Sequence, residues 1–213
     1  MRGCPEEGGP NAENSTLING FYETRPIIYD EHAYGFARTG QTICNVTDSK
    51  IIKLFVDDEP FWLPDAHLLS YDRRLNMKSG TLDRDILWET PAGKQVSIKS
   101  RRLISFPNRH VAAISYCVTL LNAEAFIVIS SEMSAKEPSA HLDSDDPRLA
   151  TPFSGRVLYP QTSYSKDRRI VLCHATKRSK LVLACATETA LETTCPQPIR
   201  LSTPMISARL PSP

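Results

Sequence analysis

The sequence has no excess of either charge and no long apolar run. Its 213 residues include 25 basic and 24 acidic side chains, which leaves a formal net charge of +1. So small a net charge gives no field that would attract nucleic acid or an anionic membrane. The longest apolar runs, near 123–129 and 181–186, are far shorter than the roughly 20 residues of a membrane-spanning helix. We therefore expect neither a nucleic-acid partner nor a membrane partner.

Secretion signals and disulfide patterns are also lacking. The opening segment, MRGCPEEGGPN, has no apolar stretch after Arg2, so it does not resemble a secretory signal and predicts a cytoplasmic protein. No two of the six cysteines have Cys-x-x-Cys spacing, and Cys117, Cys173 and Cys185 lie in apolar, β-branched segments. Cysteine in such segments behaves as a small hydrophobic residue. We predict buried free thiols rather than disulfides.

The common catalytic and cofactor-binding motifs are absent as well. The sequence has no Gly-x-Ser-x-Gly, no P-loop, no Rossmann glycine motif and no His-Glu-x-x-His. Its five histidines have no metal-ligand spacing, and 143–146 (DSDD) lacks the glycine and distal glutamate of a calcium loop. The acidic runs Glu6-Glu7 and Asp57-Asp58-Glu59 lie at turn-like places where carboxylates are usually hydrated. We therefore expect no catalytic residue, no metal and no cofactor in this chain.

What the sequence does contain is a series of short β-like runs separated by turn signals, from Ile51 to about Thr187. In TLDRDILWE, Leu82, Ile86 and Trp88 alternate with acidic residues, as in a strand with one hydrated face. This alternation places Trp88 in the core. The pattern predicts an all-β fold, an antiparallel sandwich.

Two segments of this series, 110–121 and 125–133, are almost entirely apolar or small. Such runs are typical of central strands that are covered on both faces. We therefore expect both to lie in the middle of the stacked sheets.

The two ends of the chain differ from this pattern. Residues 1–50 carry few strand alternations, which predicts a loop-rich N-terminal part before a β-sandwich core at 51–195. Residues 196–213 contain five prolines, each of which removes a backbone donor that a central strand needs. We expect this tail to be disordered or out of frame.

Several stretches together resemble one known family: INGFYETRPIIYDEHAYGFARTGQTICNVTDSK, then IIKLFVDDEPF, then YDRRLNMKSGTLDRDILWETPAGKQVSIKSRRLISFPNRHVAAISYCV. Over about residues 2–195 the chain is similar to the N-terminal domain of glycoside hydrolase family 65. The most specific part is a series of residues whose order and spacing resemble the central hairpins of that domain: Arg74, Leu75, Met77, Gly80, Leu82, Arg84, Trp88, Gly93, Ser100, Arg102, Ser105, Arg109, His110 and Ala113.

The resemblance implies both a fold and an activity for the parent enzyme. Family members include kojibiose, maltose and trehalose phosphorylases, which cleave an α-glucosidic bond with inorganic phosphate; related members hydrolyse it. The implied fold is a β-supersandwich, a helical linker, an (α/α)6 barrel with the general-acid glutamate and phosphate site, and a small C-terminal sheet. This chain matches only the first part, so none of the family's catalytic residues can be carried over. Phosphate is a co-substrate of the parent alone, the disaccharide reaches it through the catalytic domain, and the full-length parent is expected to form a homodimer.

The start of the chain departs from the family pattern. Residues 2–8, RGCPEEG, resemble an Arg-Gly-Asn-x-Glu-Glu-Gly motif that in full-length members follows an earlier strand. We therefore expect a sandwich that is incomplete at its N-terminal edge, and a fragmentary gene product.

Three functional hypotheses remain open. The first is a non-catalytic domain of a phosphorylase or hydrolase, inactive alone. The alternative is a stand-alone carbohydrate-binding module, in which exposed aromatics stack on sugars. A third is a subunit that acts in trans with a separate catalytic half. Under the first hypothesis the aromatics contact the catalytic barrel; under the second they bind sugar. The candidates are Tyr22, Tyr29, Tyr34 and Trp62.

Overall fold

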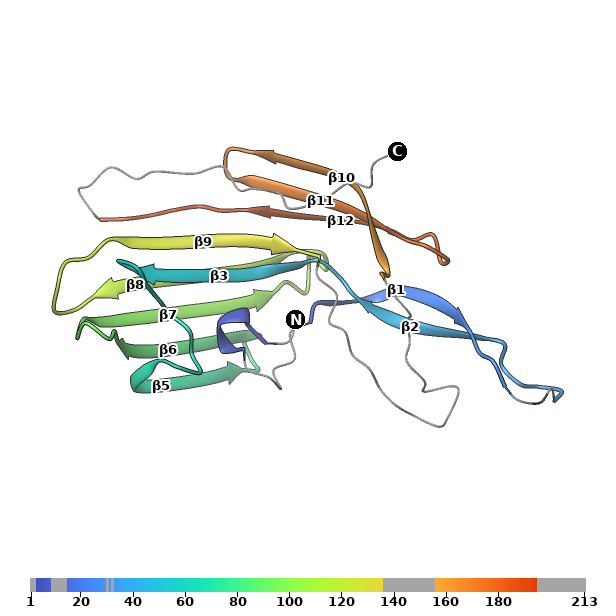
Figure 1. The fold of residues 1–213 in the computed structure, drawn as a ribbon, viewed down its shortest axis with the longest axis horizontal. Helices are drawn as coiled ribbons and strands as arrows, with labels where there is room; N and C mark the ends of the chain where they lie inside the picture. Colours follow the sequence, from blue (N-terminus) through green and yellow to red (C-terminus); the bar gives the residue numbers. More distant parts are fainter. Residues whose placement is uncertain (1–2, 9–14, 30, 32, 136–155, 195–213) are drawn as a thin grey trace. The chain divides into compact units, whose positions relative to one another are not determined.

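A computed structural model of the chain describes residues 3–8, 15–29, 31, 33–135 and 156–194. Within these ranges the fold is all-β, with one 3-10 turn, η1 (Pro5–Glu7), and no α-helix (Figure 1). The assigned strand pairs are antiparallel, as the sequence predicts. The proline-rich tail, 196–213, lies outside the described residues. The strands are β1 (Leu17–Pro26), β2 (Thr39–Asn45), β3 (Asp48–Val56), β4 (Glu59–Pro60), β5 (His67–Asn76), β6 (Thr81–Glu89), β7 (Gln95–Ile104), β8 (Ala112–Leu120), β9 (Ile127–Ser134), β10 (Leu158–Lys166), β11 (Arg169–Thr176) and β12 (Val182–Glu188).

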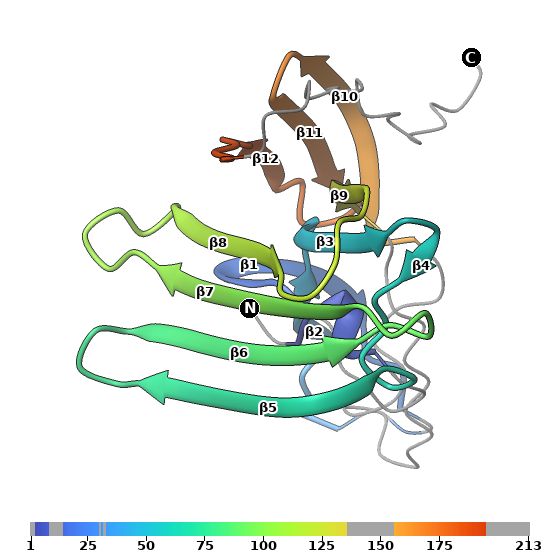
Figure 2. The ribbon, with the colours of Figure 1, turned by 90° about the vertical axis from the view of Figure 1, so that its left-hand side faces the viewer.

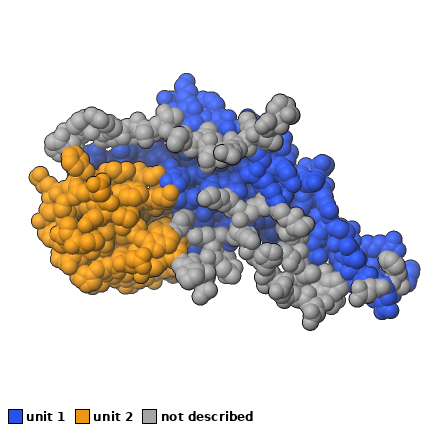
Figure 3. Space-filling view, in the orientation of Figure 1, with its two compact units in different colours: residues 1–3, 13–51, 131–213 blue, residues 4–12, 52–130 orange. Residues whose placement is uncertain are grey.

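The strands are distributed over two compact units, coloured separately in Figure 3. Unit 1 comprises residues 1–3, 13–51 and 131–213, and unit 2 comprises residues 4–12 and 52–130. The strands β3 and β9 belong to one sheet, in the order β4-β3-β9.

Unit 2 is built on the sheet β5-β6-β7-β8, a meander of long hairpins (Figure 2). The alternation along β6 buries Ile86 and Trp88 while Asp85 stays exposed. Trp88, 2% exposed, packs against Phe61 with ring centroids 5.2 Å apart, which confirms that it belongs to the core. The buried cluster of unit 2 contains Leu54, Val56, Phe61, Ile86, Trp88, Val96 and Ile98.

Unit 1 contains the hairpin β1-β2 and the sheet β10-β11-β12. Its buried cluster is Phe21, Cys44, Val46, Val157 and Leu158, with Leu181 and Leu183 packed against it. The two sheets are also joined by Glu23 of β1, whose carboxylate accepts hydrogen bonds from the backbone N–H groups of Arg178 (2.9 Å) and Ser179 (2.7 Å). Burial opposes ionisation of Glu23, but the backbone N–H groups of Arg178, Thr24 and Ser179 outweigh it and lower the pKa.

The loop-rich N-terminal part that the sequence predicts differs from the structure in two places. Strands β1 and β2 both lie before residue 50, and β3 begins at Asp48. The first four residues of β1, 17–20, are all exposed, so both faces of the strand are exposed there. A strand that is exposed on both faces needs no apolar alternation, so the pattern that marks the other strands is missing here.

The prediction of two fully covered central strands is wrong. In the described sheets β8 is the last strand of β5-β6-β7-β8, and β9 is the last strand of β4-β3-β9. Exposed and half-buried residues alternate along β8, and Ile127, Val128 and Ile129 of β9 are each at least 40% exposed. Apolar runs cannot distinguish a covered strand from an edge strand, because sheet order is not encoded locally.

The cysteines are partly as predicted. The five within the described residues are free thiols, and Cys4 and Cys44 are buried. Cys173 and Cys185 are half-buried, whereas Cys117 is exposed because it lies on the outward-facing side of β8. Cys195 lies outside the described residues.

A buried histidine makes the stability of unit 1 depend on pH. His174 is 3% exposed, and its Nδ1 lies 3.4 Å from the hydroxyl oxygen of the fully buried Thr47. Burial, and secondly the charge of Arg156, lower the pKa of His174 below its ordinary value of about 6.5. Between the lowered pKa and about pH 6.5 the unfolded chain therefore binds more protons than the folded unit. The free energy of unfolding decreases as the pH is lowered through that window.

We expect the urea midpoint of the wild type to decrease as the pH falls from about 7 toward that lowered pKa. In the His174→Gln variant this part of the pH dependence should be absent, because glutamine does not titrate. The measurement is urea unfolding at a series of pH values. Parallel losses in both proteins would show that His174 is not the cause.

Candidate functional site

The hairpin β1-β2 carries the aromatic residues that the sequence singles out. Its connecting segment begins after Pro26, which is paired with Thr39, and the backbone pairing continues with a hydrogen bond from Ile27 N–H to the Arg38 carbonyl (3.0 Å). Gly35 has φ +88°, a conformation that a residue with a side chain adopts only with strain. This turn therefore holds the residues on either side of it close together.

Within this segment Tyr29 and Phe36 form a pair of tilted rings, with centroids 4.7 Å apart and planes at 43°. They line a hollow of about 390 Å³, together with Ile27, Ile28, Ala33 and Arg38. Aromatic faces beside a guanidinium group can hold either a sugar ring or the apolar side chain of a protein partner. We call this feature the hairpin hollow.

The four predicted site residues occupy different environments. Tyr29 lines the hairpin hollow, and Tyr34 lies in the same turn and is fully exposed. Tyr22 is half-buried within β1 opposite Ile43, and its carbonyl accepts a hydrogen bond from the Ser179 hydroxyl (2.7 Å). Trp62 belongs to unit 2, where it is 41% exposed after β4. The structure thus brings Tyr29 and Tyr34 to one turn.

Two members of the hollow, Phe36 and Arg38, are not among the residues that the sequence singles out. Both follow the turn at Gly35, so they face the residues before the turn only once the hairpin has closed. Recognising Gly35 as a hairpin turn would have found them.

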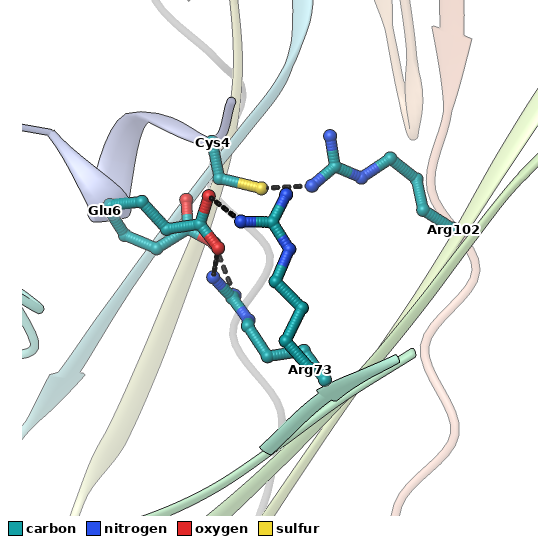
Figure 4. Close-up of polar contacts among 6 residues, drawn as sticks. Cys4, Glu6, Arg73 and Arg102 are labelled. Atoms are coloured by element: carbon teal, nitrogen blue, oxygen red, sulfur yellow. Dashed lines mark hydrogen bonds and ion pairs between the residues drawn. The ribbon is translucent and has the colours of Figure 1, made fainter. Parts of the chain in front are cut away.

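A second concentration of chemistry-bearing residues lies in unit 2, around η1 (Figure 4). Arg84 of β6 donates hydrogen bonds to Glu6 (2.5 Å) and to Glu7 (2.7 Å), and Arg73 of β5 pairs with Glu7 at 3.6 Å. Arg102 of β7 donates to the Cys4 sulfur. The side chains of Arg84 and Glu6 are only 5% and 6% exposed. We call this group the buried ionic cluster.

The charges and the burial of this cluster determine whether its side chains are protonated. Burial alone would lower the pKa of Arg84, but the Glu6 carboxylate raises it above its ordinary value, so Arg84 stays charged. Burial, and secondly Glu6, raise the pKa of the Cys4 thiol to about 11, which keeps it protonated and unreactive at neutral pH. Burial likewise raises the pKa of Tyr116.

The residues of the buried ionic cluster are thus paired with one another inside unit 2. The sequence predicts that Glu6 and Glu7 are hydrated, which is wrong, because both are enclosed and paired with arginine. Asp57 is also engaged: its carboxylate pairs with Lys94 and accepts the backbone N–H of Phe126 (3.0 Å). Glycosidic bond cleavage needs a carboxylic acid beside the scissile oxygen, and these carboxylates are committed to structural partners.

Two searches of the described part of the chain bear on other classes of function. No group of three or more His, Cys, Asp and Glu side chains is placed to hold a metal ion. No helix there is long and apolar enough to cross a membrane.

Comparisons with known proteins agree with one another. Residues 1–209 match the model of "Glycosyl hydrolase family 65, N-terminal domain", a range that extends past Cys195 into the proline-rich segment. An alpha,alpha-trehalose phosphorylase of Thermoanaerobacter brockii is 39% identical over 195 residues, which are 90% of this chain and 25% of that protein. An uncharacterized glycosyl hydrolase of Mycobacterium tuberculosis is 38% identical over 192 residues, 90% of this chain and 24% of that protein.

A solved structure shows the same fold. A putative kojibiose phosphorylase from the human microbiome aligns with a TM-score of 0.65 at 20% identity. The alignment covers 85% of this chain and 22% of the other. The chain thus spans about a quarter of the length of the proteins that it matches.

Proposed function

The chain belongs to glycoside hydrolase family 65, whose N-terminal domain it contains, and we propose that it is the non-catalytic β-sandwich part of a cytoplasmic enzyme that acts on α-glucosidic disaccharides. The observation that carries this proposal is the match over 90% of this chain to only 25% of a trehalose phosphorylase. The commitment of Glu6, Glu7 and Asp57 to structural partners supports it, because these carboxylates are not available for general acid catalysis.

In this role the domain supports a catalytic domain and has no turnover of its own. Phosphate and disaccharide are then bound by the catalytic part of the enzyme, which can be phosphorolytic or hydrolytic. Tyr34 on the hairpin and Trp62 in unit 2 provide exposed aromatic surface for contacts with that part, and the half-buried Tyr29 adds to it. The full-length enzyme would form a homodimer through other surfaces.

The proposal can be tested with a chimera of the T. brockii trehalose phosphorylase in which this chain replaces the N-terminal quarter. We expect the chimera to fold and to release glucose 1-phosphate from trehalose and phosphate. A folded but inactive chimera, beside an active parent enzyme, would contradict the proposal.

The hairpin hollow favours one alternative, a stand-alone carbohydrate-binding module, because Tyr29 and Phe36 present aromatic rings beside Arg38. Our proposal predicts that the isolated chain shows no saturable binding of trehalose, kojibiose or maltose with a dissociation constant below about 1 mM. Isothermal titration calorimetry measures this. Binding that is lost in Tyr29→Ala and kept in Tyr164→Ala, an exposed tyrosine of β10 outside the hollow, would support the module instead.

A further inference from the structure

Five large apolar side chains are exposed together at one end of unit 2. They lie in the β5-β6 and β7-β8 turns or in the last two residues of the strands before them. The two turns are neighbours because Thr81 at the start of β6 pairs with Leu103 at the end of β7. Figure 2 shows both turns at the same end of the sheet. We call this group the hairpin-end patch: Leu75, Met77, Ile104, Phe106 and Val111.

The exposure of the patch is unusual for a chain with its own core. Met77 is 82% exposed and Phe106 is 83% exposed. Single exposed apolar residues are ordinary, but five on two neighbouring hairpin ends, a phenylalanine and a methionine among them, mark a surface that another surface covers.

The two turns hold these side chains in defined positions. In the first turn the Asn76 side chain accepts hydrogen bonds from the backbone N–H groups of Lys78 and Ser79, both at 3.1 Å. Gly80 has φ +68°, and a Cβ there would lie 3.4 Å from Cε2 of Phe106, so the phenyl ring rests directly on this glycine. The patch is therefore preorganised, which lowers the entropic cost of binding.

The second turn is fixed in the same way. The Ser105 hydroxyl oxygen accepts the backbone N–H of Asn108 (3.1 Å), and Val111 N–H donates to the Asn108 carbonyl (2.9 Å). Both turns thus use local hydrogen bonds to present apolar side chains outward.

The rim of the patch has one sign of charge. Residues 75–81 and 103–111 contain the exposed Lys78 and Arg109 and no acidic residue, whereas the neighbouring Arg74 is paired with Asp72 at 2.7 Å. A complementary surface has an apolar centre flanked by carboxylates. A symmetric contact between two copies would instead bring Lys78 and Arg109 of one copy toward the same residues of the other.

From these observations we infer that the hairpin-end patch docks on the part of a full-length family 65 enzyme that follows its N-terminal quarter. The inference rests on the proposed function and specifies which surface carries the contact. The curated relatives are about four times as long as their match with this chain, so the polypeptide that could cover the patch exists in them. Its docking surface is expected to be apolar with an acidic rim.

The location can be tested by hydrogen exchange on the lone chain and on the chimera with the T. brockii trehalose phosphorylase. We expect the backbone amides of 77–80, 105, 106 and 108–110 to exchange at least about tenfold more slowly in the chimera. Amides near Phe126, at the opposite end of the same unit, should not change. Unchanged exchange in both turns, or equal protection at both ends, would overturn the inference.

Variants provide a second test with a matched control. The patch variants are M77S/F106S and K78E/R109E; the control is F126S, because Phe126 is also 83% exposed and the hydrogen bonds of its backbone with Asp57 are retained. In the lone chain all three should leave the unfolding midpoint of wild type unchanged. In the chimera each patch variant should reduce trehalose phosphorolysis about tenfold or more, and F126S should not.

The outcomes separate the two proposals. If the wild-type chimera folds but has no activity, the proposed function fails and the inference fails with it. If the wild-type chimera is active and the patch variants match F126S, the inference fails and the proposed function stands. Self-association of the lone chain that M77S/F106S abolishes would assign the patch to a second copy and also overturn the inference.

Discussion

Replacing Arg84 with methionine is expected to lower the free energy of unfolding of unit 2 by about 3–5 kcal/mol. Methionine keeps much of the apolar stem but removes the guanidinium that donates to both Glu6 and Glu7. The Glu6 side chain is 6% exposed, so its carboxylate would remain buried with its main counter-charge gone. Chemical denaturation followed by circular dichroism measures the loss.

The same sheet offers a matched control. Arg101 of β7 also pairs with a carboxylate, Asp83, but its side chain is 66% exposed. Because water screens such a pair, Arg101→Met should leave the denaturation midpoint close to that of the wild type. Adding Glu6→Leu to Arg84→Met should recover part of the loss, since the unpaired charge is then removed. Equal losses of stability in the two arginine variants would show that the buried pairs of Arg84 contribute no more than the exposed pair of Arg101.

Replacing Trp88 with alanine is the second change with a large expected effect, a loss of about 3–5 kcal/mol. Trp88 is 2% exposed and packs against Phe61, so its removal leaves a cavity in the core of unit 2 and deprives Phe61 of its aromatic neighbour. Trp88→Phe should cost less, because it retains an aromatic ring.

The chain has two tryptophans, and the other one provides the control. Trp62 is 41% exposed, so Trp62→Ala should change the free energy of unfolding by less than about 1 kcal/mol. Urea unfolding of both variants measures the difference. If Trp62→Ala proves the more destabilising change, the assignment of the core to the β6 face would be wrong.

The sequence predicts well those features that local periodicity determines. The strand TLDRDILWE alternates apolar and acidic residues, and the structure buries Ile86 and Trp88 as that alternation requires. The all-β antiparallel fold follows from a repetition of such runs and from turns such as the one at Gly93, where φ is +78°.

Features that depend on distant partners could not be predicted in this way. Glu6 and Glu7 look like hydrated turn residues in the sequence, and the arginine that buries them lies 78 and 77 residues further along the chain. The order of strands in a sheet is also nonlocal, which explains why β8 and β9 were expected to be covered on both faces. The hairpin hollow needs the closed turn to bring Tyr29 and Phe36 together.

The buried ionic cluster gives a physical reason for the RGCPEEG segment near the start of the chain. Cys4, Glu6 and Glu7 contact arginines of three successive strands of one sheet, β5, β6 and β7. The segment is thereby attached to the sheet by ion pairs of Glu6 and Glu7 and by the hydrogen bond that Cys4 accepts from Arg102. Its acidic residues belong to the fold, which agrees with a non-catalytic role for this domain.

The central claim, that this domain is non-catalytic, is tested most directly by incubating the purified chain with kojibiose, maltose or trehalose and inorganic phosphate and following glucose 1-phosphate. The account predicts no release above the rate without protein, for any of the three sugars. Release of glucose 1-phosphate that scales with the concentration of the lone chain would contradict it.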